Sequence, residues 1–489
     1  MFSVKKQLFS FYFQSLLGIT VSYSTLAANV PISSIDRPVP EKMVQVAEPK
    51  QQQKAPADFP HTGFQYVYDE KLLAQDFSAT EQLLNLAINS GQLNHIEKLL
   101  KIYRTFSQQD PILVLFAEAQ IAKLQGDYST AITLYRQIIA QRPDLTPVRI
   151  QLAICLFYSQ QDNAAQDQFE QALSDQALPQ DIASLVNQYL TALKNRQGWK
   201  VNLSATYLHT DNVNNASSEH YLENTPFVKN DSMLPQKAHG VGYQFGIERD
   251  LNLFNGHYLH LENDLYGRNY WDAHDYDEII NRTLLGYRHK NEKTQWSLLP
   301  FNEQQWYGGH RYKRSIGGRG ELTHWFTPNW QISTALEYGR NCYAQNDNLD
   351  GNSKLASLTL LWRKTPQQYF YAGIDAIRET TNIRHYSYDL TTARLGWGQE
   401  WLLGISSRLN VSASKRKYKD NLSLGANFHF DRAREDEIYQ INTAVWKRDW
   451  HIWGITPKLN YHWKKQRSNF SSLYSYSDKG ITLSLEKTF

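Results

Sequence analysis

The last residues of the chain alternate between apolar and polar side chains. Ile481, Leu483 and Leu485 fall on one face of an extended segment, and Thr482 and Ser484 fall on the other. Successive side chains of a β-strand point to opposite faces, so this alternation predicts a strand with one apolar and one polar face. Such a strand can border water or lipid, and the rest of the sequence decides between them.

The same alternation recurs throughout residues 199–489. The segments that show it are 199–210, 239–249, 257–270, 276–290, 294–307, 312–326, 330–344, 353–364, 368–380, 387–398, 405–419, 436–449, 454–464 and 478–489. All thirteen tryptophans lie between residues 199 and 463 and cluster at strand ends, as in the aromatic girdles of membrane barrels. An even number of antiparallel strands closes a barrel with both ends on one side. We therefore predict a 14-stranded antiparallel transmembrane β-barrel over residues 198–489, rather than a water-soluble sandwich.

The predicted connections alternate in length. Every second one is short and flanked by aromatic residues, as at 325–330, 362–366 and 450–453. We assign these turns to the periplasm, so the long loops lie outside the cell: 211–238, 420–435 and 465–477. The terminal aromatic residue, Phe489, is the kind of ending that the barrel-assembly machinery reads, and we interpret it as an insertion signal.

Residues 70–197 follow a helical period and contain an internal repeat of about 34 residues. The repeat shows at six positions, where Ala119, Ala131 and Tyr135 recur as Ala153, Ala165 and Phe169. Small residues recur where paired helices touch and aromatic residues recur where they fill the gap, so we interpret these positions as structural core. The pattern resembles the tetratricopeptide repeat. The predicted fold class is therefore α+β multidomain, with a helical repeat domain that precedes the barrel and lies in the periplasm.

The first residues predict export from the cytoplasm. Lys5 and Lys6 precede an apolar stretch at 8–19, and Ala27 offers a cleavage site, so residues 1–27 read as a signal peptide rather than an uncleaved anchor. Residues 28–69 are rich in proline and glutamine and are predicted to form a disordered leader. The mean hydropathy of −0.56 excludes a helical membrane protein.

The sequence offers little chemistry. It contains no nucleophile elbow, zinc-protease motif or phosphate-binding loop, so we predict no catalytic residue, metal site or cofactor. His257 and His260 are three residues apart on a strand and face opposite sides, which does not suit a shared metal. A barrel enzyme such as an outer-membrane phospholipase needs only a few inward residues and stays an alternative. The formal charge of +3 argues against a nucleic-acid partner.

Two basic clusters are candidates for lipid contact. Strand parity places both at the outer rim, where they are expected to meet lipopolysaccharide phosphates: Arg311, Lys313 and Arg314 in one, Lys415, Arg416 and Lys417 in the other. The alternative is that they are ordinary solvated loop charges.

The order of a periplasmic repeat domain and a barrel resembles the surface lipoprotein assembly modulator family. The most specific motifs lie at 434–439, 446–459, 473–476 and 486–489, and a shorter one lies at 211–214. The resemblance covers nearly all of the predicted mature chain and implies an outer-membrane translocator without catalytic residues. It also implies client proteins: surface lipoproteins, or soluble haem-binding relatives released to the medium. The residues that bind a client are not identified by it.

Two other functions remain open at this point. An exopolysaccharide export porin also joins periplasmic helical repeats to a barrel, although such porins carry longer repeat arrays than the three units that fit here. A passive nutrient channel would leave the repeats without a role. The mechanism expected from the resemblance is that the repeats hold an extended client, the polar lumen gives it a hydrated path, and folding outside makes the step irreversible without ATP.

Overall fold

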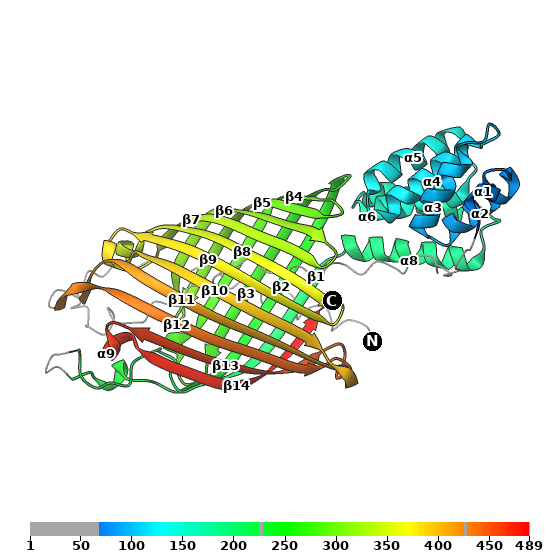
Figure 1. Ribbon diagram of the computed structural model, residues 1–489. Coiled ribbons are helices and arrows are strands. Elements are labelled where there is room, and N and C mark those ends of the chain that lie inside the picture. The colour runs from blue at the N-terminus through cyan, green and yellow to red at the C-terminus, as the bar shows by residue number, and fades with distance from the viewer. Residues whose placement is uncertain (1–67, 224–227, 425–427, 489) are drawn as a thin grey trace, which may run out of the picture.

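The computed structural model describes residues 68–223, 228–424 and 428–488. Helices come first in this part of the chain: α1 (Glu70–Leu73), α2 (Phe77–Asn89), α3 (Leu93–Tyr103), α4 (Pro111–Leu124), α5 (Tyr128–Gln141), α6 (Thr146–Tyr158), α7 (Asp162–Leu173) and α8 (Gln180–Gln197). They form a separate body at one end of the strands (Figure 1). No helix in the described ranges is long and apolar enough to span a membrane.

Helices that follow one another in the sequence pack together, and capping residues and a glycine turn set where they begin and end. Asp76, Asp110 and Asp127 precede α2, α4 and α5, and the side chain of each accepts a backbone N–H of the first turn. Gly126 takes a φ of +78° between α4 and α5, a conformation that glycine adopts without strain. All six positions of the predicted repeat are fully buried in one core that runs from α4 to α8. The helices are therefore held by the repeat positions read from the sequence.

Fourteen strands follow: β1 (Lys200–Thr210), β2 (Ala238–Phe254), β3 (His257–Tyr270), β4 (Glu278–Lys290), β5 (Thr294–Tyr307), β6 (His310–Thr327), β7 (Trp330–Tyr343), β8 (Gly351–Thr365), β9 (Gln368–Thr381), β10 (Tyr388–Glu400), β11 (Ile405–Leu424), β12 (Phe428–Lys447), β13 (Thr456–Ser468) and β14 (Tyr476–Thr488). Each pairs antiparallel with its neighbours, and β1 meets β14 to close a barrel. The predicted fold class is confirmed. β14 ends on the side of the barrel at which the helices lie (Figure 1).

The connections contain single turns. These are η2 (Asp231–Met233), η3 (His274–Tyr276), η4 (Asp347–Leu349), η5 (Arg384–Tyr386), η6 (Leu402–Gly404) and α9 (Ser471–Tyr474). Two predicted long loops are wrong in extent. Much of 420–435 belongs to β11 and β12, which continue past bulges near Asn421 and form a long hairpin, and β13 continues to Ser468. These segments carry polar residues at successive positions, so they lack the alternation of apolar and polar residues by which the other strands were predicted.

The two faces of the strands differ as the alternation predicts. Leu336 and Ile481 are 65% and 68% exposed on the outer surface, as lipid-facing residues must be in the protein alone. On the opposite face of β14, the hydroxyl of Ser484 accepts a hydrogen bond of 2.8 Å from the amide of Asn460 in the neighbouring strand. The predicted wet and apolar faces of the last strand are confirmed for 481–485. Residues 1–27, Phe489 and nearly all of the predicted leader lie outside the described residues.

Aromatic residues mark the rim next to the helices. Trp330, Trp362 and Phe370 lie side by side on β7, β8 and β9, with neighbouring ring centroids 5.7 and 5.6 Å apart. Indole rings favour the boundary between hydrocarbon and water, so this row fixes the depth of the barrel at the periplasmic side.

Candidate functional site

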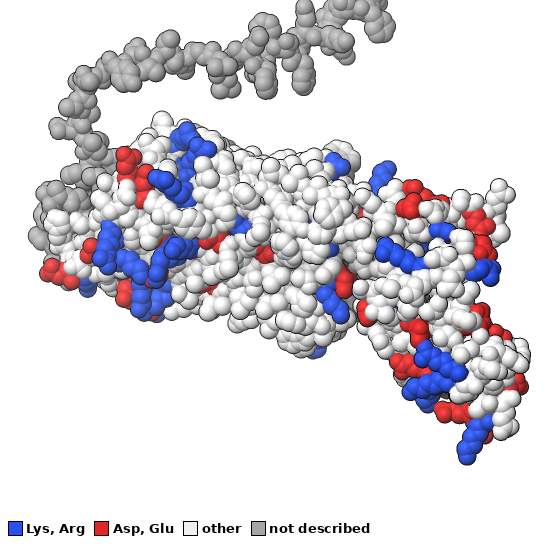
Figure 2. All heavy atoms as spheres, turned by 90° about the horizontal axis from the view of Figure 1, so that it is seen from above, with Lys and Arg blue, Asp and Glu red and all other residues white. Residues whose placement is uncertain are grey.

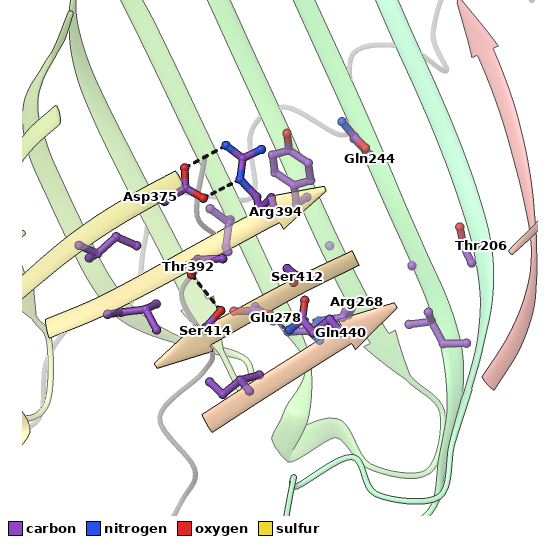
Figure 3. A pocket seen from close by; sticks show the side chains of 18 of the residues that line it. Thr206, Gln244, Arg268, Glu278, Asp375, Thr392, Arg394, Ser412, Ser414 and Gln440 are labelled. Atoms are coloured by element: carbon purple, nitrogen blue, oxygen red, sulfur yellow. Dashed lines mark hydrogen bonds and ion pairs between the residues drawn. The ribbon is translucent and has the colours of Figure 1, made fainter. Parts of the chain in front are cut away.

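A cavity of about 640 Å³ lies inside the barrel. Its lining comes from β1 to β4 on one wall and from β9 to β12 on the other, so it crosses the lumen. Figure 3 shows polar side chains from both walls pointing into it, among them Thr206, Gln244 and Gln440. Hydroxyl and amide groups can bind water or a polypeptide backbone, which suits a hydrated path.

Charged residues at this cavity are paired with one another. In the second wall, the guanidinium of Arg394 donates to both carboxylate oxygens of Asp375, at 2.6 and 2.9 Å (Figure 3). In the first wall, Glu278 accepts from Arg268 through Nε at 3.1 Å and from the amide of Gln305 at 2.7 Å. Since each charge has an opposite partner, these pairs set no strong preference for the charge of a passing segment.

A second network of charges braces the wall formed by β4 to β7. Glu337 accepts from Arg282 at 2.7 Å and from Arg319 at 3.0 Å, while Glu303 accepts from Arg282 at 3.1 Å and from Lys313 at 3.1 Å. All of these side chains are largely buried. Buried charges are stable only when they are paired, so the network holds four strands in register.

The network corrects part of the lipopolysaccharide hypothesis. Lys313 is buried against Glu303, and Arg416 lies 3.7 Å from the buried Asp436, so both point into the lumen and not toward lipid. The neighbouring residues Arg311, Arg314, Lys415 and Lys417 are exposed. Figure 2 shows basic side chains gathered toward the end of the barrel that lies away from the helices.

The helical domain is bound to the barrel through a buried contact. The hydroxyl of Tyr258, at the start of β3, donates to the carboxylate of Asp162 in α7 at 3.1 Å and lies 3.1 Å from the carbonyl oxygen of Gln160. Asp162 also forms an ion pair of 2.5 Å with Arg196 of α8, and both are almost fully buried. Next to this contact, Arg249 of β2 donates to the carbonyl of Gln197 at 3.1 Å. The last repeat helices are thereby held at the periplasmic mouth.

A cluster of ionisable groups lies on β2 and β3 just inside that mouth. Glu248, His260 and Glu262 each offer a ligand atom, and these atoms lie within 4.8 Å of one another. The two nitrogens of His260 contact Asp250 at 2.7 Å and Glu262 at 2.9 Å, and Lys200 lies 2.8 Å from Glu248. These residue types could hold a divalent metal. Asp250 also pairs with Arg288 and Lys290 of β4, so the hydrogen bonds of the cluster already satisfy its charges.

Sequence reasoning missed both the interdomain contact and this cluster. It compared His260 with His257 on the same strand, whereas the neighbours of His260 in space are Asp250 and Glu248 of β2, across the register, and Glu262 two residues further along β3. The sequence did carry a signal for the cluster: polar residues occupy alternate positions 248 and 250 on one strand and 260 and 262 on the next, so they share the inward face.

Comparison with known proteins shows the family to which this chain belongs. Residues 199–489 match the family model described as surface lipoprotein assembly modifier, and residues 66–169 match the model of its N-terminal tetratricopeptide repeats. The chain belongs to the surface lipoprotein assembly modifier family. The resemblance seen in the sequence is thus confirmed, and the protein is an outer-membrane barrel preceded by helical repeats.

Known relatives align with most of this chain. The surface lipoprotein assembly modifier of Pasteurella multocida is 34% identical over 100% of this chain and 99% of its own length. Surface lipoprotein assembly modifier 1 of Haemophilus influenzae is 34% identical over 82% of each chain. The hemophilin secretion modulator of Acinetobacter baumannii is 27% identical over 83% of this chain and 85% of its own.

Proposed function

We propose that this protein is an outer-membrane translocator that exports specific client proteins from the periplasm to the cell surface or the medium. The observation that carries the proposal is the position of the repeat domain, whose last helices are bound at the mouth of a polar lumen. Relatives are named for surface lipoprotein assembly and for hemophilin secretion, which supports clients that are lipoproteins or haem-acquisition proteins.

The cavity inside the barrel bears on the state of the client. The part of the lumen that it occupies, about 640 Å³, is comparable with a small-molecule pocket and far smaller than a folded domain. The client therefore enters as an extended segment that is handed over by the repeats. Folding of a domain outside releases about 5–15 kcal/mol, which opposes its return without any nucleotide or catalytic step.

Export through the barrel lumen also gives roles to the other parts of the chain. Residues 1–27 act as a signal peptide, 28–69 as a leader, 70–197 as the client-receiving periplasmic domain and 198–489 as the barrel. Phe489 serves the barrel-assembly machinery during insertion. The exposed cations Arg311, Arg314, Lys415 and Lys417 bind lipopolysaccharide phosphates and so orient the barrel in the outer leaflet.

The experiment is an export assay with the secreted protein encoded next to this chain as client. Both are expressed in a Gram-negative host that lacks them, and intact cells and medium are probed with antibody and protease. We expect the client outside only when this chain is present, and we expect deletion of residues 70–197 to reduce its export. Client retention in the periplasm, with polysaccharide crossing instead, would favour the export-porin alternative.

A further inference from the structure

The barrel is closed by the pairing of β1 with β14, and this pairing covers few residues. Residues 202–206 of β1 pair with residues 484–488 of β14. By contrast, β1 pairs with β2 over residues 200–210, and β14 pairs with β13 over residues 476–486. Within β1 and β14, both fully covered by the described residues, residues 207–210 and 477–483 have no register partners across this seam.

This open stretch lies in the outer half of the barrel, because β1 runs outward from the helical domain. Four residues at about 3.3 Å each span roughly 13 Å along the strand, which at a tilt of about 40° is roughly 10 Å of the height of a 25 Å apolar band. A backbone N–H or C=O group without a partner in lipid costs several kcal/mol, so membrane barrels normally pair their edges throughout. A side-chain hydrogen bond of 3.4 Å from Thr210 to Asp478 bridges the stretch.

Loops hold the outer ends of the two seam strands together. The ammonium group of Lys229, in the loop after β1, donates to the carbonyl of Ser472 in α9 at 2.7 Å. The backbone N–H of Glu223 donates to the hydroxyl of Ser472 at 2.7 Å, and that hydroxyl donates to the Glu223 carboxylate at 2.9 Å. We call Glu223, Lys229 and Ser472 the outer clasp. Because α9 directly precedes β14, the clasp closes the seam above the unpaired stretch with side-chain contacts.

We propose that the outer half of the β1–β14 seam is a strand-pairing site that takes an extended segment of the exported polypeptide. The inference rests on the proposed function and names where the barrel binds its client. Ser204, Thr206 and Leu208 of β1 line the lumen cavity, so a segment inside the barrel lies next to the edge of β1.

The chemistry of the edge selects an extended polypeptide. Unpaired strand edges need alternating N–H and C=O partners at the strand repeat, and a peptide backbone supplies them whatever its side chains are. A lipid acyl chain has no such groups. Pairing along the seam also lets the barrel widen by an inserted strand, which removes the limit that the small cavity sets.

The test is a reversible lock across the seam, in a background in which the exposed Cys342 is replaced by Cys342→Ser. The seam variant combines Thr210→Cys with Asp478→Cys. In the native chain, Thr210 Oγ1 and Asp478 Oδ1 are 3.4 Å apart. The matched control combines Lys464→Cys with Asp478→Cys, since Lys464 and Asp478 are register partners in β13 and β14. Both pairs lose Asp478, and only one disulfide spans the seam.

We expect oxidised seam-variant cells to show client export no higher than cells that lack the chain, with recovery after reduction. Oxidised control cells should export normally. Full export by a seam variant whose disulfide is verified on a non-reducing gel would overturn the inference while leaving the translocator function intact. Absence of export by the wild-type chain would overturn the proposed function and this inference together.

A second measurement identifies the occupant. The single variant Thr210→Cys is expressed with clients that carry one cysteine each, placed along the sequence in turn. A disulfide-linked adduct of chain and client is expected during export. Adducts between two copies of the chain in place of chain–client adducts would show that the edge pairs with a second barrel, and would overturn the assignment.

Discussion

The hydroxyl of Tyr258 in the barrel donates a hydrogen bond of 3.1 Å to the carboxylate of Asp162 in the repeat domain. Because Asp162 is completely buried and also binds Arg196, this contact joins the two parts through a desolvated charge. Such contacts are costly to break, so the repeat domain is fixed against the barrel mouth and does not swing freely.

Removing the hydroxyl should loosen this junction. Tyr258→Phe leaves the buried carboxylate with one partner fewer, at a cost of about 1–3 kcal/mol. We expect faster hydrogen exchange in α7 and α8 of the full-length protein, with the barrel unchanged. Tyr338→Phe is the control, since Tyr338 donates to Asn352 on the barrel's exposed face at 3.0 Å. Equal exchange in both variants would contradict a fixed junction.

The buried network around Glu337 should dominate barrel stability. Glu337→Gln removes the charge that Arg282 and Arg319 share, and it leaves Arg282 with Glu303 and Arg319 with Glu321 as carboxylate partners. The loss of these buried hydrogen bonds between charged groups should cost about 1.5–3 kcal/mol. We expect the temperature at which the barrel unfolds on a heat-modifiability gel to fall. Glu435→Gln breaks the exposed pair with Lys415 at 3.4 Å and should cost less than about 1 kcal/mol. The same loss for both variants would show that the network adds nothing.

The cap of α5 should make the repeat domain sensitive to acid. Hydrogen bonds from the side chain and backbone of Thr130 hold the pKa of Asp127 below its ordinary value of 3.8. The stabilisation is therefore present above about pH 3.8 and is lost as the pH falls through the lowered pKa. Asp127→Ala should cost about 1 kcal/mol at pH 7, measured by melting of the helical circular dichroism signal.

Asp127→Asn is the matched variant for this prediction. An asparagine can cap the helix but does not titrate in this range, so it should keep most of the stability at pH 7 and lose the acid dependence of the cap. An unchanged pH profile in Asp127→Asn would mean that the acid sensitivity arises elsewhere.

The exposed basic residues should bind lipid phosphate. Arg314→Glu with Lys417→Glu reverses two outward charges, and we expect less lipopolysaccharide to co-purify with the barrel, with a weaker dependence on salt. The control is Lys354→Glu, an outward cation of β8 outside the two clusters. If the double variant retains as much lipopolysaccharide as the control, these residues are solvated surface charges.

The strands could be predicted from the sequence because lipid on one side and a polar lumen on the other impose a period of two. The middle of the terminal strand, residues 481–485, follows this rule. β5 departs from it, because Leu299 and Phe301 are buried inside the barrel against Leu284. The prediction failed at β11 and β12, where bulges beyond Lys417 break the period and polar residues face water on both sides. Within the basic clusters, parity separates inward Lys313 and Arg416 from outward Arg314, Lys415 and Lys417. Arg311 is outward as well, because a bulge lies between it and Lys313.

Contacts between distant segments could not be predicted in this way. Arg282 and Glu337 are 55 residues apart, and Tyr258 and Gln160 are 98 residues apart. Their pairing depends on the register of the intervening strands and on the angle at which α8 enters β1. Neither quantity leaves a local pattern in the chain.

The most direct test of the account is translocation by the purified protein. The chain is reconstituted in liposomes without nucleotide, an unfolded client is supplied from the side of the repeat domain, and protease is added afterwards. The account predicts that a fraction of the client becomes protease-protected inside the vesicles only when the chain is present. Client that stays as accessible as with empty liposomes would contradict the claim that this barrel is itself the path.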